Sequence, residues 1–200
     1  MSELTYRMCQ TATDLKTRSE QDGEMTIEGY FAIFNKVTEL WPGAYEKIDP
    51  EAFNNTLGND IRALINHDTT LVLGRNKANT LSLSIDSYGL FGVIQINSED
   101  RDAMNLYERV KRGDVDQCSF GFNILNEEID FKDDGTIEWT LKEIDLHEVS
   151  VCTFPAYADT AVQARHNEVE QHKKRMFEQK KMKVRDKLNG IKTVNDSEKD

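Results

Sequence analysis

The sequence predicts an α+β fold, mainly an antiparallel β-barrel or β-sandwich with flanking helices, followed by a helical C-terminal tail. Two observations lead to this prediction. About seven segments have the alternation, or the β-branched and aromatic content, that is typical of strands, whereas only two segments before residue 163 have a helical pattern. Regularly spaced helices do not separate the strands, which disfavours a doubly wound parallel sheet.

The predicted strands lie between residues 26 and 154. Residues 26–34 are aromatic and β-branched, and residues 61–66 form an apolar run that ends at His67, so both segments predict buried strands. In residues 80–86 leucine and isoleucine alternate with serine and threonine, which predicts a half-buried strand that forms a hairpin with residues 90–96. Further strands are predicted at residues 117–125, 138–144 and 148–154, and Pro155 ends the strand region.

Two helices are predicted within this region. Asp49 and Pro50 have the residue types of a helix start, and Gly58 is placed to end that short helix. A longer helix is predicted to begin after Ser98 as N-cap and to end at Gly113. Its apolar face repeats with helical spacing, at Ala103, Leu106, Tyr107 and Val110.

Composition and charge divide the chain into three parts. Residues 1–24 are polar and weakly patterned, which predicts a flexible leader with at most one short strand, and residues 25–162 form the predicted domain. Residues 163–200 carry 11 Lys+Arg and 7 Asp+Glu, so the preceding residues carry −15 of a total net charge of −11. This part predicts a charged helical or disordered tail, and the acidic body argues against specific nucleic-acid binding.

Composition also excludes several classes of protein. No run approaches the roughly 18–20 apolar residues that span a bilayer, and the N-terminus lacks the apolar core of a secretion signal, so we expect no membrane association and a cytoplasmic location. Cys9, Cys118 and Cys152 form no CxxC pair, and no HExxH occurs among the four histidines. We therefore expect neither disulfides nor a metal site, and no cofactor.

Ser119 and His67 are the candidate nucleophile and base. Strand alternation groups Cys118 with Phe120 on a core face and leaves Ser119 on an open face, where Gly121 leaves room for a substrate backbone. A serine needs a base to become nucleophilic, and His67, at the end of a buried strand, has the side chain best suited to that role at neutral pH.

A third residue must hold the other imidazole nitrogen. The candidates cluster between residues 144 and 150, where alternation puts Glu148 on one face and Asp145 and His147 on the other. The sequence does not choose between these faces. Asp68 is a further candidate, although neighbouring side chains on a strand point apart.

Five motifs occur in a fixed order along this part of the chain. They are Gly29–Phe34, Ile65–Asp68 followed by Leu73–Arg75, Asp86–Leu90, Gly113–Asp114 before Ser119–Phe122, and Glu148–Ala156. Together they resemble the tailed-phage prohead (capsid-maturation) serine protease family. The resemblance covers about residues 25–165.

The resemblance implies a herpesvirus-protease-like fold and a role for each candidate residue. The motif positions imply Ser119 as nucleophile, His67 as general base and Glu148 as the residue that orients the histidine, with His147 as the alternative because herpesvirus relatives use a second histidine. Arg75 is a possible helper in catalysis, although the favoured interpretation is a surface arginine without a catalytic role.

The resemblance also implies a function and partners. Such enzymes cleave scaffold, the N-terminal region of the major capsid protein, and themselves, inside the assembling prohead in the host cytoplasm. Self-cleavage would remove the tail from about residue 163, and herpesvirus relatives suggest a dimer.

Three other functions are compatible with parts of the sequence. The first is a non-enzymatic capsid-assembly or scaffold protein with the same fold. The second is a cysteine hydrolase that uses Cys118, which alternation instead buries in the core. The third is a metal hydrolase built on His67 and Asp68, which lacks further ligands.

Overall fold

A computed structural model describes residues 5–8, 15–19 and 24–154, together with isolated positions 169, 170, 174, 177, 178, 181, 182 and 185. The chain divides into two units, Met1–Ala158 and Asp159–Asp200, and the account below concerns the first. The predicted tail, residues 163–200, falls outside the described residues apart from those isolated positions. Within the described residues no helix is both long enough and apolar enough to cross a bilayer.

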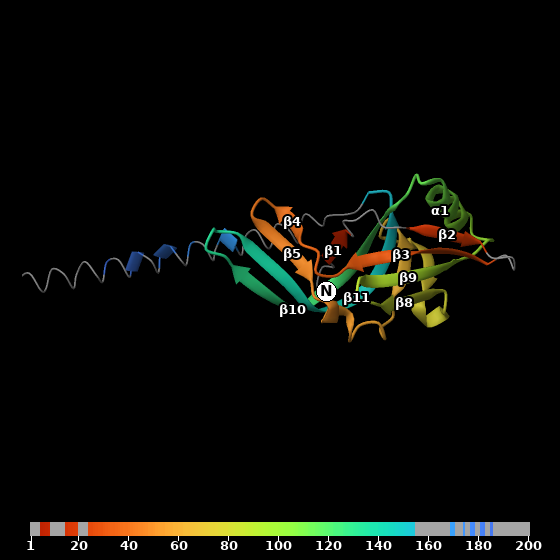
Figure 1. Cartoon of the computed structure of the whole chain (residues 1–200). Helices are drawn as coiled ribbons and strands as arrows, with labels where there is room; N and C mark the ends of the chain where they lie inside the picture. Colours follow the sequence, from red (N-terminus) through yellow and green to blue (C-terminus); the bar gives the residue numbers. More distant parts are fainter. Residues whose placement is uncertain are drawn as a thin grey trace, which may run out of the picture. The chain divides into compact units, whose positions relative to one another are not determined.

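Strands form most of the described part of this unit, which also contains one α-helix and two short 3-10 helices (Figure 1). In chain order the elements are β1 (Thr5–Met8), β2 (Lys16–Ser19), β3 (Met25–Ile33), β4 (Thr38–Trp41), β5 (Ala44–Ile48), η1 (Pro50–Phe53), β6 (Arg62–Ile65), β7 (Asp68–Arg75), η2 (Asn76–Ala78), β8 (Leu81–Ile85), β9 (Gly89–Ile96), α1 (Arg101–Arg112), β10 (Gln117–Phe131) and β11 (Ile137–Cys152).

The strands form two sheets. The larger has the order β1-β10-β11-β5-β4, with β6 paired to β11 and β7 paired to β6; the smaller has the order β2-β3-β9-β8. On its edge opposite β10, β11 pairs in parallel with β5 through residues 137–141 and with β6 through residues 148–151. Neither sheet closes on itself within the described part of the chain, so the α+β class is confirmed but the predicted barrel is not shown.

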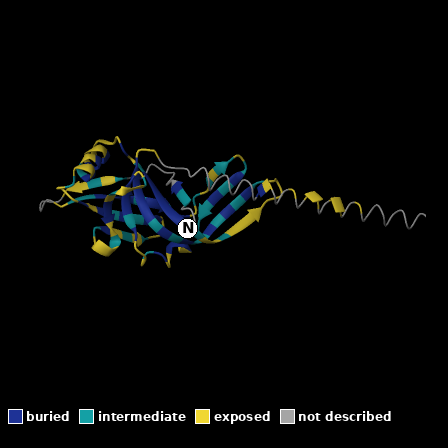
Figure 2. Ribbon diagram, turned by 180° about the vertical axis from the view of Figure 1, so that it is seen from behind, coloured by how far each residue is buried: buried dark blue, intermediate teal, exposed yellow. Residues whose placement is uncertain are grey.

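The hydrophobic core lies between the two sheets. It joins buried side chains of β3 and β9 with those of β10 and β11, and Figure 2 shows that burial is concentrated in the strands of the body. Phenylalanine rings connect its parts: Phe53 of η1 lies 5.8 Å from Phe120 of β10, which stacks on Phe122 at 4.9 Å. The helix α1 is tied to β2 by a hydrogen bond from the Tyr107 hydroxyl to the Arg18 carbonyl.

Local signals placed the helix starts well, with one shift. Asp49 caps η1 as predicted, and Gly113 ends α1 with φ +82°. The N-cap of α1 is Asp100 rather than Ser98, because the Asp100 carboxylate accepts the N–H groups of Asp102 and Ala103. The short helix ends at Phe53 and does not extend to Gly58, because the chain continues from residue 54 as turns.

Several strands were missed by the sequence patterns. The structure has two short strands before residue 24, where at most one was predicted, and three unpredicted strands in β4, β5 and β7. The predicted strands 138–144 and 148–154 are one continuous strand, β11. β1 is secured by a buried ion pair between Arg7 and Glu46 of β5, 2.5 Å apart, a long-range contact that local patterning does not reveal.

We expect Phe53→Ala to lower the free energy of unfolding by about 3–5 kcal/mol, because it empties a fully buried ring position next to Phe34 and Phe120. Phe154→Ala is the matched control, since that ring is 85% exposed, and it should change stability by less than about 0.5 kcal/mol. Urea titration of the two variants measures both values. Equal effects would contradict the assignment of Phe53 to the core.

Candidate active site

His67 lies at the tip of the β6–β7 hairpin. Ile65 pairs with Asp68, so only Asn66 and His67 form the turn, with φ of +50° and +61°. Positive φ at both central residues is the signature of a type I′ turn, which commonly has asparagine first and glycine second. Histidine at the second position is therefore a strained choice, of the kind that occurs at functional sites.

Contacts with β11 hold this turn in place. The Asn66 N–H donates to the Val151 carbonyl at 3.1 Å, and the Asn66 side-chain oxygen accepts the N–H of Thr153 at 2.9 Å. The His67 N–H donates to the Ser150 hydroxyl at 3.2 Å. These hydrogen bonds fix the position of His67 relative to β11.

Ser119 lies on β10, directly opposite Ser150 of β11. Directly paired residues of an antiparallel ladder share a face, so both serines lie on the face away from Cys118 and Phe120, which are core residues. The predicted division of faces is confirmed, but this face is not open, because Ser119 is fully buried. Its hydroxyl donates to the Arg7 carbonyl of β1 at 2.8 Å, and no hydrogen bond joins Ser119 to His67 among the described residues.

Glu148 reaches the imidazole of His67. Its Oε1 lies 2.6 Å from Nδ1, and its Oε2 accepts the Ser150 hydroxyl at 2.6 Å. Both side chains are nearly buried, with exposed fractions of 11% for His67 and 6% for Glu148. A carboxylate at this distance can hold the Nδ1–H tautomer, in which Nε2 carries the lone pair that accepts a proton.

A β-bulge decides which face Glu148 takes. Gly121 pairs with Glu148, but the next residue of β10, Phe122, pairs with Leu146, so His147 is the extra residue. Leu146 therefore points into the core, whereas Glu148 joins the face of Ser119 and Ser150. Regular alternation would place Leu146 and Glu148, two residues apart, on one face, so it does not predict this separation.

The other candidates for the third position have different partners. His147 contacts the Asn123 side chain at 2.9 Å and Asp145 at 3.3 Å through Nε2. Asp145 also accepts a hydrogen bond from Asn59, and the Asp68 carboxylate accepts the N–H and hydroxyl of Thr70. Of these acidic and histidine side chains, the described contacts pair Glu148 with His67.

The imidazole lies lengthwise along β11. Nδ1 faces Glu148, and Nε2 lies 3.8 Å from the Cys152 thiol, so the ring spans the position of Ser150 between them. Ser119 is the ladder partner of Ser150 on the neighbouring strand β10. Tyr6 of β1 packs edge-on against the imidazole, with ring centroids 4.5 Å apart.

Gly121 leaves room for the carboxylate rather than for substrate. A Cβ at this position would lie 2.5 Å from Glu148 Oε1 and 2.9 Å from the Tyr6 ring. The space beside Gly121, which was expected to admit a substrate backbone, is therefore occupied by the Glu148 carboxylate. The glycine allows the acid to lie flat against β10 while it contacts His67.

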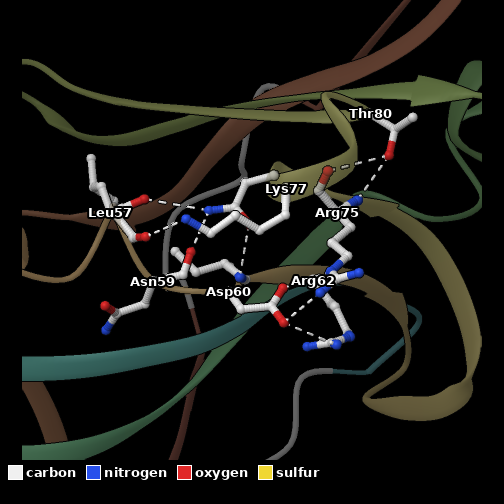
Figure 3. Close-up of polar contacts among 10 residues, drawn as sticks. Leu57, Asn59, Asp60, Arg62, Arg75, Lys77 and Thr80 are labelled. Atoms are coloured by element: carbon white, nitrogen blue, oxygen red, sulfur yellow. Dashed lines mark hydrogen bonds and ion pairs between the residues drawn. The ribbon is translucent and has the colours of Figure 1, made fainter.

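Arg75, the possible helper, is paired with Asp60 (Figure 3). Its guanidinium makes two contacts of 2.7 Å with Asp60, which also contacts Arg62 at 3.2 Å. The hydrogen bond from Arg75 holds the pKa of Asp60 at about 2. Arg75 thus forms part of a surface cluster that ties β7 to the loop before β6.

Both described cysteines are buried and unsuited to nucleophilic attack. The Cys118 thiol donates to the Tyr30 carbonyl inside the core. Burial, with a smaller effect from Glu148, raises the pKa of Cys152 to about 12, so this thiol stays neutral at physiological pH despite its position near His67. These environments disfavour a cysteine mechanism.

We expect Gly121→Ala to leave the fold intact and to lower hydrolytic turnover about 10²-fold, because the new methyl group displaces the flexible end of Glu148 from His67. Gly58→Ala is the control, since a Cβ there meets nothing within 4 Å and φ is not positive. Processing rates and circular dichroism of the two variants test this. Normal turnover in a folded Gly121→Ala protein would contradict the role given to the Glu148–His67 contact.

We expect iodoacetamide at pH 8 to leave Cys118 and Cys152 of the folded protein unmodified, because both thiols are buried and that of Cys152 has a pKa of about 12. Peptide mass mapping before and after denaturation measures this, since both sites should react once the chain unfolds. Rapid modification of Cys152 in the native protein would show that a reactive thiolate faces His67.

Comparison with known proteins identifies the family of this chain. The model of the caudovirus prohead serine protease family matches residues 13–175. The prohead protease of Enterobacteria phage HK97 is 30% identical over 169 residues, which cover 82% of this chain and 70% of the relative. The alignment with the solved capsid assembly protease of bacteriophage T4 covers 76% of this chain and 97% of that chain, at 10% identity and a TM-score of 0.45. The chain belongs to the caudovirus prohead serine protease family and is a serine protease of phage capsid maturation.

Proposed function

We propose that this prohead protease cleaves peptide bonds with Ser119 as nucleophile, His67 as general base and Glu148 as the residue that orients the base. The contact of 2.6 Å between His67 Nδ1 and Glu148 Oε1, beside the Ser119–Ser150 ladder pair, is the observation that carries the proposal. It supplies the base and the orienting acid on the sheet face that carries the serine.

In the proposed reaction, Nε2 of His67 takes the Ser119 proton as Oγ attacks the scissile carbonyl carbon. The tetrahedral intermediate collapses when His67 returns this proton to the leaving amine, and water then hydrolyses the acyl-enzyme by the same route. Glu148 keeps the Nδ1–H tautomer and stabilises the imidazolium that forms in each step.

The attack requires one local change at Ser119. Its hydroxyl donates to the Arg7 carbonyl, so Oγ must turn about χ1 from β1 toward Nε2. An extended substrate that approached Ser119 along this edge of β10 would have to replace β1, which pairs Met8 with Ser119. The nucleophile is thus enclosed in this arrangement.

We infer the substrates from the family: the N-terminal region of the major capsid protein, the scaffold, and the chain itself. Residues 25–162 would form the protease domain after a leader at 1–24, and self-cleavage would remove the charged tail from about residue 163. We place the enzyme within the assembling prohead in the host cytoplasm, as a dimer that uses no specific nucleic acid. A herpesvirus-protease-like barrel and a helical tail remain part of this proposal.

We expect Ser119→Ala to abolish both capsid-protein trimming and self-cleavage when the chain is co-expressed with its cognate capsid and scaffold proteins. Intact-mass spectrometry of wild type and variant measures both events. His67→Gln should be as inactive, because without the base the serine hydroxyl is not activated. Processing that continues in folded Ser119→Ala would move the nucleophile to another residue.

The same assay tests the third position. Glu148→Gln should reduce processing less than Ser119→Ala does, because Glu148 orients the base and does not react. His147→Gln is its control, since His147 contacts Asn123 and Asp145. A greater loss in His147→Gln, with the fold intact by circular dichroism, would transfer the orienting role to His147.

A further inference from the structure

Ser150 contacts two of the three proposed catalytic residues and is the ladder partner of the third. Its hydroxyl donates to Oε2 of Glu148 at 2.6 Å and accepts the backbone N–H of His67 at 3.2 Å. Ser119 lies directly opposite it on β10. The side chain is fully buried, so solvent does not compete for these bonds.

The bond to Glu148 restricts a torsion that is otherwise soft. Rotation of a glutamate carboxylate about its last bond has only broad preferences, so strand geometry alone does not aim Oε1 at Nδ1 of His67. Because Ser150 holds Oε2, the carboxylate plane is fixed and Oε1 stays on the imidazole. The Ser150 hydroxyl and the His67 imidazole thus contact different oxygens of the Glu148 carboxylate.

The second hydrogen bond of Ser150 is made with the backbone of His67. His67 follows Asn66 in a left-handed conformation that most side chains avoid, with φ of +61°. The Ser150 hydroxyl accepts the N–H of His67 and so ties this strained residue to β11. One hydroxyl therefore sets the position of the base and the orientation of the acid together.

We propose that Ser150 is a positioning residue that holds His67 and Glu148 in fixed positions relative to each other. It thereby fixes the Nδ1–H tautomer of His67. This inference rests on the proposed function for its catalytic consequence. The geometric part is independent of that function, because the tautomer of His67 can be measured in a chain that does not react.

The test uses the full-length chain with Ser119→Ala, which prevents self-cleavage. Long-range ¹H–¹⁵N spectra of ¹⁵N-histidine-labelled protein report the tautomer of His67, whose signals are assigned by comparison with His67→Gln. We expect the Nδ1–H tautomer in this background and a mixture of tautomers after Ser150→Ala. Ser150→Thr, which keeps a hydroxyl, should restore the single tautomer.

Thr56→Val is the matched control. Thr56 is also buried, and its hydroxyl accepts the N–H of Leu146 on the same strand β11 at 2.7 Å, without contact to His67 or Glu148. This variant should lose comparable stability and leave the tautomer unchanged. With Ser119 restored, Ser150→Ala should slow capsid-protein processing about 10–100-fold, as loss of a residue that orients a catalytic group does, and Thr56→Val should slow it less than about twofold.

An unchanged tautomer in Ser150→Ala, or equal shifts in Ser150→Ala and Thr56→Val, would overturn the proposal. If Ser150→Ala does not fold, Ser150→Cys replaces it with the same expectation, because a thiol of similar size is a weak donor and acceptor. A changed tautomer together with processing that persists in Ser119→Ala would uphold the positioning role and reject the proposed nucleophile.

Discussion

The hydrogen-bonded ladder between β10 and β11 is the constraint on which the candidate site depends. It sets Ser119 opposite Ser150 and Gly121 opposite Glu148, while the other edge of β11 pairs with β6, whose turn carries His67. The proposed nucleophile, acid and base therefore come from three adjacent strands. Neighbouring strands lie about 4.7–4.9 Å apart because backbone hydrogen bonds join them. The same hydrogen bonds therefore set the spacing between the backbone positions of the three residues.

Two departures from regular strand geometry aim these side chains. The bulge at His147 turns Leu146 into the core and Glu148 onto the face of Ser119 and Ser150, and the left-handed turn at Asn66 and His67 brings the imidazole into contact with Glu148 of β11. Strained backbone persists only where its surroundings determine it strongly. Here the hydrogen bonds of β11 to the turn provide that support, so the ladder that spaces the strands also sustains the strain.

Local sequence signals could predict the helices, most core strands and the faces of β10, because capping and alternation act over a few residues. The cap at Asp49 and the core positions Phe120 and Phe122 are examples. The pairing of β1 with β10, the burial of Ser119 and the face of Glu148 depend on residues distant in sequence or on a bulge, neither of which alternation encodes. The motifs include the segments that carry His67 and Glu148, which the structure brings into contact, whereas the space that Gly121 provides became evident only from the position of the Glu148 carboxylate.

The surface cluster in Figure 3 has a consequence for the buried acid. Arg62 is the ladder neighbour of Glu148 on β6, so its side chain starts from the same face of the sheet. A guanidinium binds a carboxylate strongly and often through two bonds, and such a bond to Glu148 would compete with His67. Instead Asp60 contacts both Arg62 and Arg75, and the two oxygens of Glu148 contact His67 and Ser150. Asp60 thus pairs with both neighbouring arginines, and among the described contacts no guanidinium competes with the imidazole for Glu148.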